Sequence, residues 1–594
     1  MQIDAQVDLE TSPDSAETMP SGSWLTRLSV ADGLYLLVIA AAAVMRFSEL
    51  GGIPLSPSEA SEAFAAWQFL QPKSLTVAIG SPAYFTLTSL LIPLLGVSDT
   101  VVRLVPAVFG LGLIFLPWLL RRQVGIIGAL ICASFLSASP LNSAISRTAG
   151  GDAIALFALL LIAVSVARLR DYANEKWFYV MTVGFGLGMA SSPLFYSGLL
   201  TITVALLLAK FFTKESVWFA PPERTTIITG LVLGALALIG LSTRILTYPA
   251  GLGASAQLIG EWLSQFGFSG SLQNTVAPFL VLARYEIALL LLGMVAVVWA
   301  IWRSNSLGIL LFLWLLITLG LMLLQSAALS NALLATLPGY LLIGLVSTYL
   351  LQQRINHRTW VFCGGLLLIG AILLVNITRY LRVSVYEQDI SNLWLGILAL
   401  AAATLIIYYF WSMSDASIVQ GLWLAALILL LAFEWGTAWH LTHTAANDSR
   451  ERWVNQGTDD DLPLLLRTLQ DISRQATNSD ADLTLLSAVD TPVLHWYLRD
   501  FWQATIGQTV SPDAQHDVII SRAEDEVPQF GTDYIGSDFG LLRSGTLPAP
   551  VSERPFADTL RWWLFHETPV ETIEERVILW VRTDLVLPQQ QNTQ

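Results

Sequence analysis

Charged side chains are scarce in this chain, and cysteine is nearly absent. Only 13% of the 594 residues are charged, about half of what ordinary soluble domains carry, and 54% are hydrophobic. This composition excludes a purely soluble globular protein. The two cysteines, Cys132 and Cys363, lie in apolar runs without metal-ligand spacing. The sequence therefore predicts buried packing residues there, rather than a disulfide or a structural zinc site.

Signals for nucleotide chemistry are missing as well. Gly184, Gly186 and Gly188 fall inside an apolar run, so they do not form a phosphate-binding loop between a strand and a helix. No convincing Asp-x-Asp motif is present on the cytoplasmic side, and 459–461 is interpreted as a solvated acidic run before a helix. The net charge of −14 comes from acids outside the apolar runs, which excludes nucleic acid as a partner and also a polybasic lipid anchor.

Long apolar runs are what the chain does have. They recur from about residue 31 to 438 at close to 20 residues each, the length that spans a hydrocarbon core of roughly 30 Å. About 13 transmembrane helices are predicted, near residues 31–48, 101–120, 124–142, 153–169, 177–191, 194–210, 225–243, 284–302, 307–325, 331–350, 359–375, 393–411 and 418–438. Residues 82–96 are shorter and contain Pro93, so we expect a helix at the interface.

Basic residues orient these helices. One side receives Arg121, Arg122, Arg168, Arg170, Lys176, Lys210, Lys214, Arg224, Arg303, Arg354 and Arg358, and the opposite side receives Arg46, Lys73, Arg147, Arg244, Arg284, Arg379 and Arg382. The positive-inside rule makes the first side cytoplasmic. We therefore expect a disordered cytoplasmic tail over 1–24, an uncleaved first span, a transmembrane domain over 25–440 and an extracytoplasmic C-terminus.

Polarity rises sharply after Trp439, which predicts a separate soluble domain over 441–594. An amphipathic helix is expected over 462–475 and a short helix over 493–502. Strands are expected over 483–489 and 518–521. The fold class is thus an all-α polytopic membrane domain with a small C-terminal extracytoplasmic α/β domain.

Acidic residues stand out in two loops on the external side. Glu59 and Glu62 are three residues apart and therefore share a helix face, directly after the first span. Asp152 closes the second external loop at the mouth of an apolar helix. Each acid could simply favour the N-terminal end of its helix. Two such loops on one face of the membrane favour a shared cavity, because ionisable groups at this depth usually line a site.

Several motifs around these loops resemble one family. The first loop reads Pro-Leu-x-x-x-Glu-Ala over 54–60, and Ser-Pro-Ala-Tyr follows over 81–84. Further matches are Gly96, Val102–Ala107, Gly110, Ser146–Arg147, Asp152–Ala153 and Tyr285–Glu286. Together they resemble the polytopic lipid-linked-sugar glycosyltransferases, including the protein O-mannosyltransferases and the aminoarabinose transferases of lipid A. The resemblance covers roughly residues 30–350.

The resemblance implies a GT-C fold in the plasma membrane and an inverting-type transfer of a sugar from a polyprenyl-phosphate donor. The acceptor would be a protein or a glycan on the extracytoplasmic face. The implied catalytic residues are Glu59, Asp152 and Glu62, with Glu59 and Asp152 as the ligands if a divalent ion, Mg or Mn, takes part. Candidates for substrate binding are Lys73, Arg147, Arg244, Arg284 and Tyr84. Each cation could equally be a snorkelling side chain.

Two departures from the family pattern leave alternatives open. Ser58 stands where the family usually has aspartate, and a hydroxyl is not a strong base. Glu59 or Glu62 then supplies the carboxylate, or the protein has lost turnover and acts as a non-catalytic scaffold. Gly150 and Gly151 replace a usual basic residue. A lipid-sugar translocation component is a third hypothesis, although it would place acids near the bilayer midplane.

A second likeness lies in the external domain. The aromatic-rich segment 491–501 resembles a motif of the flippase-associated family of archaeal protein glycosylation. A different interpretation is an amphipathic helix that packs on the membrane domain. Both remain open from the sequence.

Overall fold

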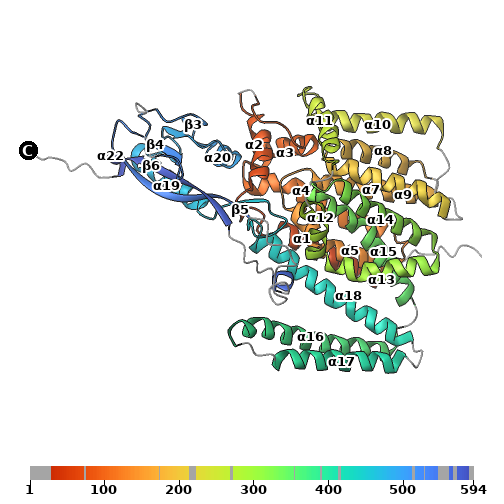
Figure 1. Cartoon of the computed structure of the whole chain (residues 1–594). Helices are drawn as coiled ribbons and strands as arrows, with labels where there is room; N and C mark the ends of the chain where they lie inside the picture. Colours follow the sequence, from red (N-terminus) through yellow and green to blue (C-terminus); the bar gives the residue numbers. More distant parts are fainter. Residues whose placement is uncertain are drawn as a thin grey trace, which may run out of the picture.

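Long helices form a bundle with a sheet domain at one end (Figure 1). The computed structural model describes residues 29–72, 75–172, 174–212, 222–267, 272–352, 355–387, 391–411, 416–511, 515–526, 529–545, 561–565 and 572–586. The bundle helices are α1 (Val30–Phe47), α4 (Asp99–Leu119), α5 (Ile126–Ala138), α6 (Pro140–Ser146), α7 (Asp152–Tyr172), α8 (Lys176–Met189), α9 (Pro193–Phe212), α10 (Arg224–Ser242), α12 (Leu272–Tyr285), α13 (Ile287–Arg303), α14 (Ser306–Leu324), η2 (Leu329–Ala335), α15 (Thr336–Leu351), α16 (His357–Glu387), α17 (Ser391–Trp411), α18 (Ala416–Trp439) and η3 (His440–Thr444). Three further helices, α2 (Pro57–Gln68), α3 (Pro82–Leu95) and α11 (Gly251–Ser264), lie at the end that carries the sheet domain (Figure 1).

The predicted number of membrane crossings is not confirmed by the described residues. Among the described residues, nine helices are long and apolar enough to cross a membrane, or up to eleven if each of two bent pairs counts as one span. A mostly helical, multi-pass architecture is confirmed, and the count of 13 is not. The predicted span 177–191 forms α8, whose 14 residues give about 21 Å of helix. For 393–411, only Gly396–Leu405 qualifies as a short apolar helix.

Both bent pairs meet at one buried glutamate. The pair α5 and α6 bends by 63°, and the pair over α12 and α13 bends by 96° at Glu286. Ser139, at the first bend, donates its hydroxyl to Glu286 Oε1 at 2.6 Å, and the backbone N–H of Leu141 donates to the same oxygen at 3.2 Å. The Tyr340 hydroxyl donates to Glu286 and also to Glu434 of α18. The contact with Glu286 satisfies the Leu141 N–H, a backbone group that the break within a membrane would leave unpaired.

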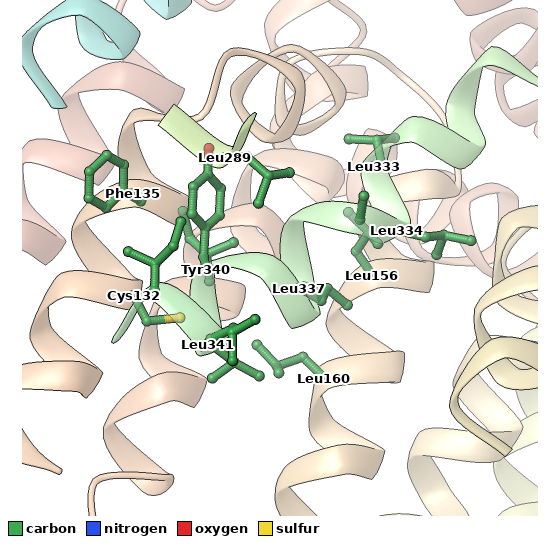
Figure 2. Packing of buried hydrophobic residues seen from close by; sticks show 14 of the residues in the cluster. Cys132, Phe135, Leu156, Leu160, Leu289, Leu333, Leu334, Leu337, Tyr340 and Leu341 are labelled. Carbon is green, nitrogen blue, oxygen red and sulfur yellow. The ribbon is translucent and has the colours of Figure 1, made fainter. Parts of the chain in front are cut away.

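Apolar side chains from α5, α7, α13, η2 and α15 fill the centre of the bundle. Figure 2 shows Cys132 and Phe135 of α5 beside Tyr340 and Leu341 of α15. The ring centroids of Phe135 and Tyr340 lie 5.4 Å apart and nearly parallel. Cys132 is fully buried and Cys363 is 1% exposed, and neither is in a disulfide. The prediction that the cysteines are buried packing residues is confirmed.

The C-terminal region forms one six-stranded sheet in the order β1-β5-β6-β4-β2-β3. Its strands are β1 (Gln456–Thr458), β2 (Leu485–Ser487), β3 (Ala504–Ile506), β4 (Val518–Arg522), β5 (Tyr534–Gly545) and β6 (Thr572–Arg582), and its helices are α19 (Leu462–Thr477), α20 (Pro492–Tyr497) and α22 (Thr583–Val586). Strand β2 pairs in parallel with β3 and β4, and the remaining pairs are antiparallel. The four elements predicted here are present, although α20 ends at Tyr497 rather than at residue 502 and β2 covers only Leu485–Ser487 of the predicted 483–489.

The aromatic-rich segment 491–501 connects this domain to the bundle. Trp496 Nε1 donates to one carboxylate oxygen of Asp99 at 2.8 Å, and the Tyr497 hydroxyl donates to the other at 2.6 Å. The backbone N–H of Leu55 in turn donates to the Tyr497 hydroxyl at 2.8 Å. Asp99 begins α4, so α20 packs where the first loop and α4 meet. The packing role that the sequence left open for this segment is confirmed.

Candidate active site

Glu59 connects three parts of the chain and has no free oxygen. It is the third residue of α2 and forms a capping box with Ser56, whose backbone N–H donates to Oε2 at 3.0 Å. Arg103 of α4 donates to both carboxylate oxygens at 2.8 and 2.9 Å. The backbone N–H of Ala149, in the second loop, donates to Oε1 at 2.9 Å. The Glu59 side chain therefore holds the two loops and α4 together.

These partners keep the Glu59 carboxylate ionised and leave neither of its oxygens available to a ligand. Burial opposes its charge, but the Arg103 guanidinium and the backbone N–H groups outweigh burial and hold the pKa of Glu59 below its usual value. A metal ion would have to displace the guanidinium to reach either oxygen. Within the described part of the chain, no group of three or more His, Cys, Asp or Glu is placed to hold a metal. The predicted catalytic and metal-binding roles of Glu59 do not fit this geometry.

Glu62 lies one turn later on α2, and its surroundings differ. Its Oε2 atom is buried without a hydrogen-bond partner. Its Oε1 atom lies against Gly80, only 2.1 Å from where a β-carbon would stand. Burial raises the pKa of Glu62 to about 7, the negative charges of Glu261 and Asp152 add to this, and the backbone N–H groups of Ser81 and Gly80 oppose it. A carboxyl with one unpaired oxygen and a pKa near 7 can exchange a proton near neutral pH.

Asp152 reaches the same region from the second loop. A β-carbon on the preceding Gly151 would stand 2.1 Å from the Ser191 carbonyl oxygen and 2.4 Å from Ser81 Oγ. Only glycine permits this close approach between the second loop, the start of α3 and the α8–α9 junction. Asp152 itself lies beside Ser192. Glu62 and Gly151, the residue before Asp152, therefore both lie against the start of α3 at Gly80 and Ser81. A cavity shared by acids of the two loops stays a prediction.

Arg147 and Arg284, which were predicted to bind substrate, stabilise the fold instead. Arg147 is 8% exposed and donates to four carbonyl groups at the end of α1, those of Met45, Arg46, Ser48 and Glu49. Arg284 is fully buried, where it donates to Glu451 at 2.9 Å and to the Trp562 carbonyl at 2.9 Å. Their donors are directed at protein groups, so these positions do not fit the predicted binding of substrate.

Tyr84 and Lys73 complete the set of predicted ligands. Tyr84 is fully buried and donates its hydroxyl to the Val102 carbonyl at 2.8 Å, which anchors α3 on α4 and leaves no access to a substrate. Lys73 lies outside the described residues.

Arg244 differs in position from Arg147 and Arg284. It follows α10 and is partly exposed, with its guanidinium 4.8 Å from the ring centroid of Phe69 at the end of α2. Its Nε donates to Ser89 Oγ of α3 at 2.8 Å. Phe69 lies seven residues beyond Glu62, which is two turns and about 10 Å along the helix axis. Arg244 therefore contacts the far end of the helix that carries Glu62.

Arg103, Ser192 and Glu261 were not assigned roles from the sequence. Arg103 lies within a matched motif. Its ion pair with Glu59 could not be predicted, because the two residues are 44 positions apart in the chain. Nothing in the local pattern of α11 distinguished Glu261, because its relation to Glu62 exists only after folding.

Comparison with known proteins supports the resemblance. Residues 80–250 match the family model of the dolichyl-phosphate-mannose-protein mannosyltransferases. The predicted resemblance is confirmed. The matched stretch contains Asp152, Gly151, Ser191 and Arg244, and the likeness of 491–501 to the archaeal flippase-associated family stays a prediction. No curated protein matches the chain.

Solved structures with a similar course of the chain are distant. ArnT from Cupriavidus metallidurans, in the apo state and bound to undecaprenyl phosphate, gives 15% identity and a TM-score of 0.47, covering 79% of this chain and 85% of ArnT. The Archaeoglobus fulgidus oligosaccharyltransferase gives 11% identity and a TM-score of 0.41, covering 82% and 65% of the two chains. At these values neither structure carries an argument about the site.

Two glycine substitutions test how this region is built. Gly80→Ala is expected to push aside only the flexible end of Glu62, so the protein folds and the carboxylate is displaced. The β-carbon of Gly151→Ala would clash with the Ser191 carbonyl oxygen. This is a backbone atom, so relieving the clash requires a shift of the main chain. Thermal unfolding in detergent should show a near-normal midpoint for Gly80→Ala and a clearly lower one for Gly151→Ala. Equal midpoints would contradict this packing.

Stability against pH tests the burial of Glu62. Its pKa in the folded protein, about 7, lies above the ordinary glutamate value, so folding favours the protonated carboxyl. This contribution is fully present below about pH 4 and is lost as the pH rises through 7, a change of roughly 3 kcal/mol. The unfolding midpoint of the wild type should therefore fall more steeply between pH 5 and 8 than that of Glu62→Gln. Parallel curves would show that Glu62 is solvated.

Proposed function

We propose that the protein is an integral-membrane glycosyltransferase that moves a sugar from a polyprenyl-phosphate donor to an acceptor on the extracytoplasmic face. The observation that supports this proposal is that Glu62 and the residue before Asp152 both lie against Gly80 and Ser81, at the start of the region 80–250 matched by the mannosyltransferase family model. Arginine-rich loop ends at the opposite end of the bundle support an extracytoplasmic position for both acids.

Glu62 would act as the general base. The acceptor hydroxyl loses its proton to the unpaired Oε2 atom while its oxygen bonds to the anomeric carbon of the sugar. The bond from that carbon to the phosphate oxygen breaks, and the phosphate leaves with the electron pair. At neutral pH, a base with a pKa near 7 is deprotonated in about half of the molecules and is still basic enough to accept a proton. Asp152 would hold the acceptor or orient Glu62, because its negative charge acts on the Glu62 carboxyl.

Arg244 would bind the donor phosphate. Three consecutive residues, Arg244, Ile245 and Leu246, have φ angles of +47°, +53° and +67°, a left-handed conformation that non-glycine residues adopt only at a cost. Hydrogen bonds hold this turn, including Ile245 N–H to the Gly240 carbonyl at 2.7 Å. Strain maintained in this way is typical of functional sites. A fixed guanidinium at the membrane surface suits a lipid-borne phosphate.

Glu62 would supply the carboxylate that is missing at Ser58, where the family usually has aspartate. Ser58 is exposed and Glu62 follows it by four residues, which places both on one face of the helix. A carboxylate one turn further on can serve the same loop. A non-catalytic or flippase-associated role is the second candidate, and the hydroxyl at Ser58 is the observation that favours it.

An assay with defined donors distinguishes the two candidates. Purified full-length protein in lipid vesicles is incubated with radiolabelled polyprenyl-phosphate hexoses and a mixture of membrane acceptors, and label transfer is measured. Transfer that depends on protein supports the enzyme. Absence of turnover with every donor, from protein that still binds them, would favour the non-catalytic role.

A further inference from the structure

A large apolar cavity lies at the end of the bundle away from the sheet domain. α4 begins beside that domain at Asp99, and the cavity opens beyond its other end, near Leu120. Its volume is about 580 Å³, within the usual range for a bound small molecule. Helices α7, α8, α9, α14 and α15 contribute the walls, which include Ile162, Leu310 and Trp314.

The depth of the cavity corresponds to one leaflet of a bilayer. Along α7 its lining runs from Ile162 to Asp171, about 14 Å of helix, and along α14 from Ser306 to Trp314, about 12 Å. Half of a hydrocarbon core is about 15 Å. An acyl chain that enters at the mouth would therefore remain within its own leaflet.

Polar groups gather at the mouth, and the inner walls are almost entirely apolar. Arg122 and Arg170 are exposed there, and the adjacent Asp171 accepts a hydrogen bond from the Gln123 amide at 2.5 Å. Trp314 donates its Nε1 to Thr201 at 3.2 Å, which satisfies its polar atom outside the cavity. The arrangement suits a ligand with an anionic head and an apolar tail.

We propose that this cavity binds an anionic glycerophospholipid from the leaflet opposite the sheet domain. Its phosphate lies against Arg122 and Arg170, and an acyl chain lies between α7, α9 and α14. A polar soluble ligand would not bury the apolar walls, and a neutral lipid would not form ion pairs with the two guanidinium groups. This site is separate from Glu62 and Asp152, so the inference does not depend on the transferase reaction.

Photolabelling in vesicles tests the site. The full-length protein is reconstituted with trace phosphatidylglycerol that carries a diazirine in its acyl chain, and adducts are mapped by mass spectrometry. We expect labelled peptides from the cavity walls. Ala167→Phe, which fills the cavity, should lower this labelling at least fivefold. Removing both Arg122 and Arg170 by alanine substitution should lower it roughly tenfold, towards the level of a matched phosphatidylcholine probe.

Arg121→Ala is the matched control. Its guanidinium lies 5.0 Å from the Trp118 ring centroid and does not line the cavity, so the same loss of charge should leave labelling unchanged. Adducts spread only over the outer surface would overturn the proposal. So would equal labelling by the anionic and neutral probes, or wall labelling that Ala167→Phe does not reduce.

Discussion

Glu62→Gln is expected to lower the rate of sugar transfer by roughly 10²-fold or more, with little change in the amount of folded protein. The amide keeps the size of the side chain but cannot accept the acceptor's proton. The buried Oε2 atom has no hydrogen-bond partner in the protein, so the substitution breaks no contact at that atom. Initial rates with a saturating polyprenyl-phosphate hexose, from pH 5.5 to 8.5, provide the measurement.

The pH profile adds a readout that a structural role would not change. Wild-type transfer should rise with pH through about 7 as Glu62 loses its proton. Glu261→Gln serves as the matched control, because it removes an exposed acid whose charge raises the pKa of Glu62. Its maximal rate should stay close to that of the wild type, and its midpoint should move to lower pH. Full activity of Glu62→Gln at every pH would remove Glu62 from the reaction.

Arg103→Met is expected to destabilise the protein by about 3–5 kcal/mol, because it leaves the buried Glu59 carboxylate without its cation. The side chain of Glu59 is 5% exposed and that of Arg103 is 7% exposed, so water cannot replace the lost partner. Thermal unfolding in detergent and recovery from size-exclusion chromatography measure the effect. Arg121→Met, an exposed arginine at the other end of α4, is the control.

A double substitution separates structure from catalysis at this pair. Changing both Glu59 and Arg103 to methionine removes the two charges together and should recover much of the lost stability. If Glu59 were instead the catalytic base, Glu59→Gln would fold like the wild type and be inactive. Normal stability of Arg103→Met would contradict the structural role.

Periodicity and length predicted most of the bundle helices, but not α11 or the strands β1, β3, β5 and β6. Amphipathic spacing predicted α19, and the short apolar run with Pro93 predicted α3. The predicted count of 13 spans is not confirmed among the described residues, because apolar composition does not show where a helix bends or ends early. The bend at Glu286 depends on Ser139 and Tyr340, which are 147 and 54 residues away in the chain.

Sequence alone also determined which loops carry the acids, but it could not distinguish the two glutamates of α2. Glu59 and Glu62 are three residues apart and have the same side chain. Tertiary structure gives Glu59 a cation 44 residues away and an N–H group 90 residues away, whereas Glu62 meets Gly80 and the charge of Asp152. Local pattern fixes the face of a helix on which a side chain lies. The energy of its charge depends on partners that only folding brings within a few ångströms.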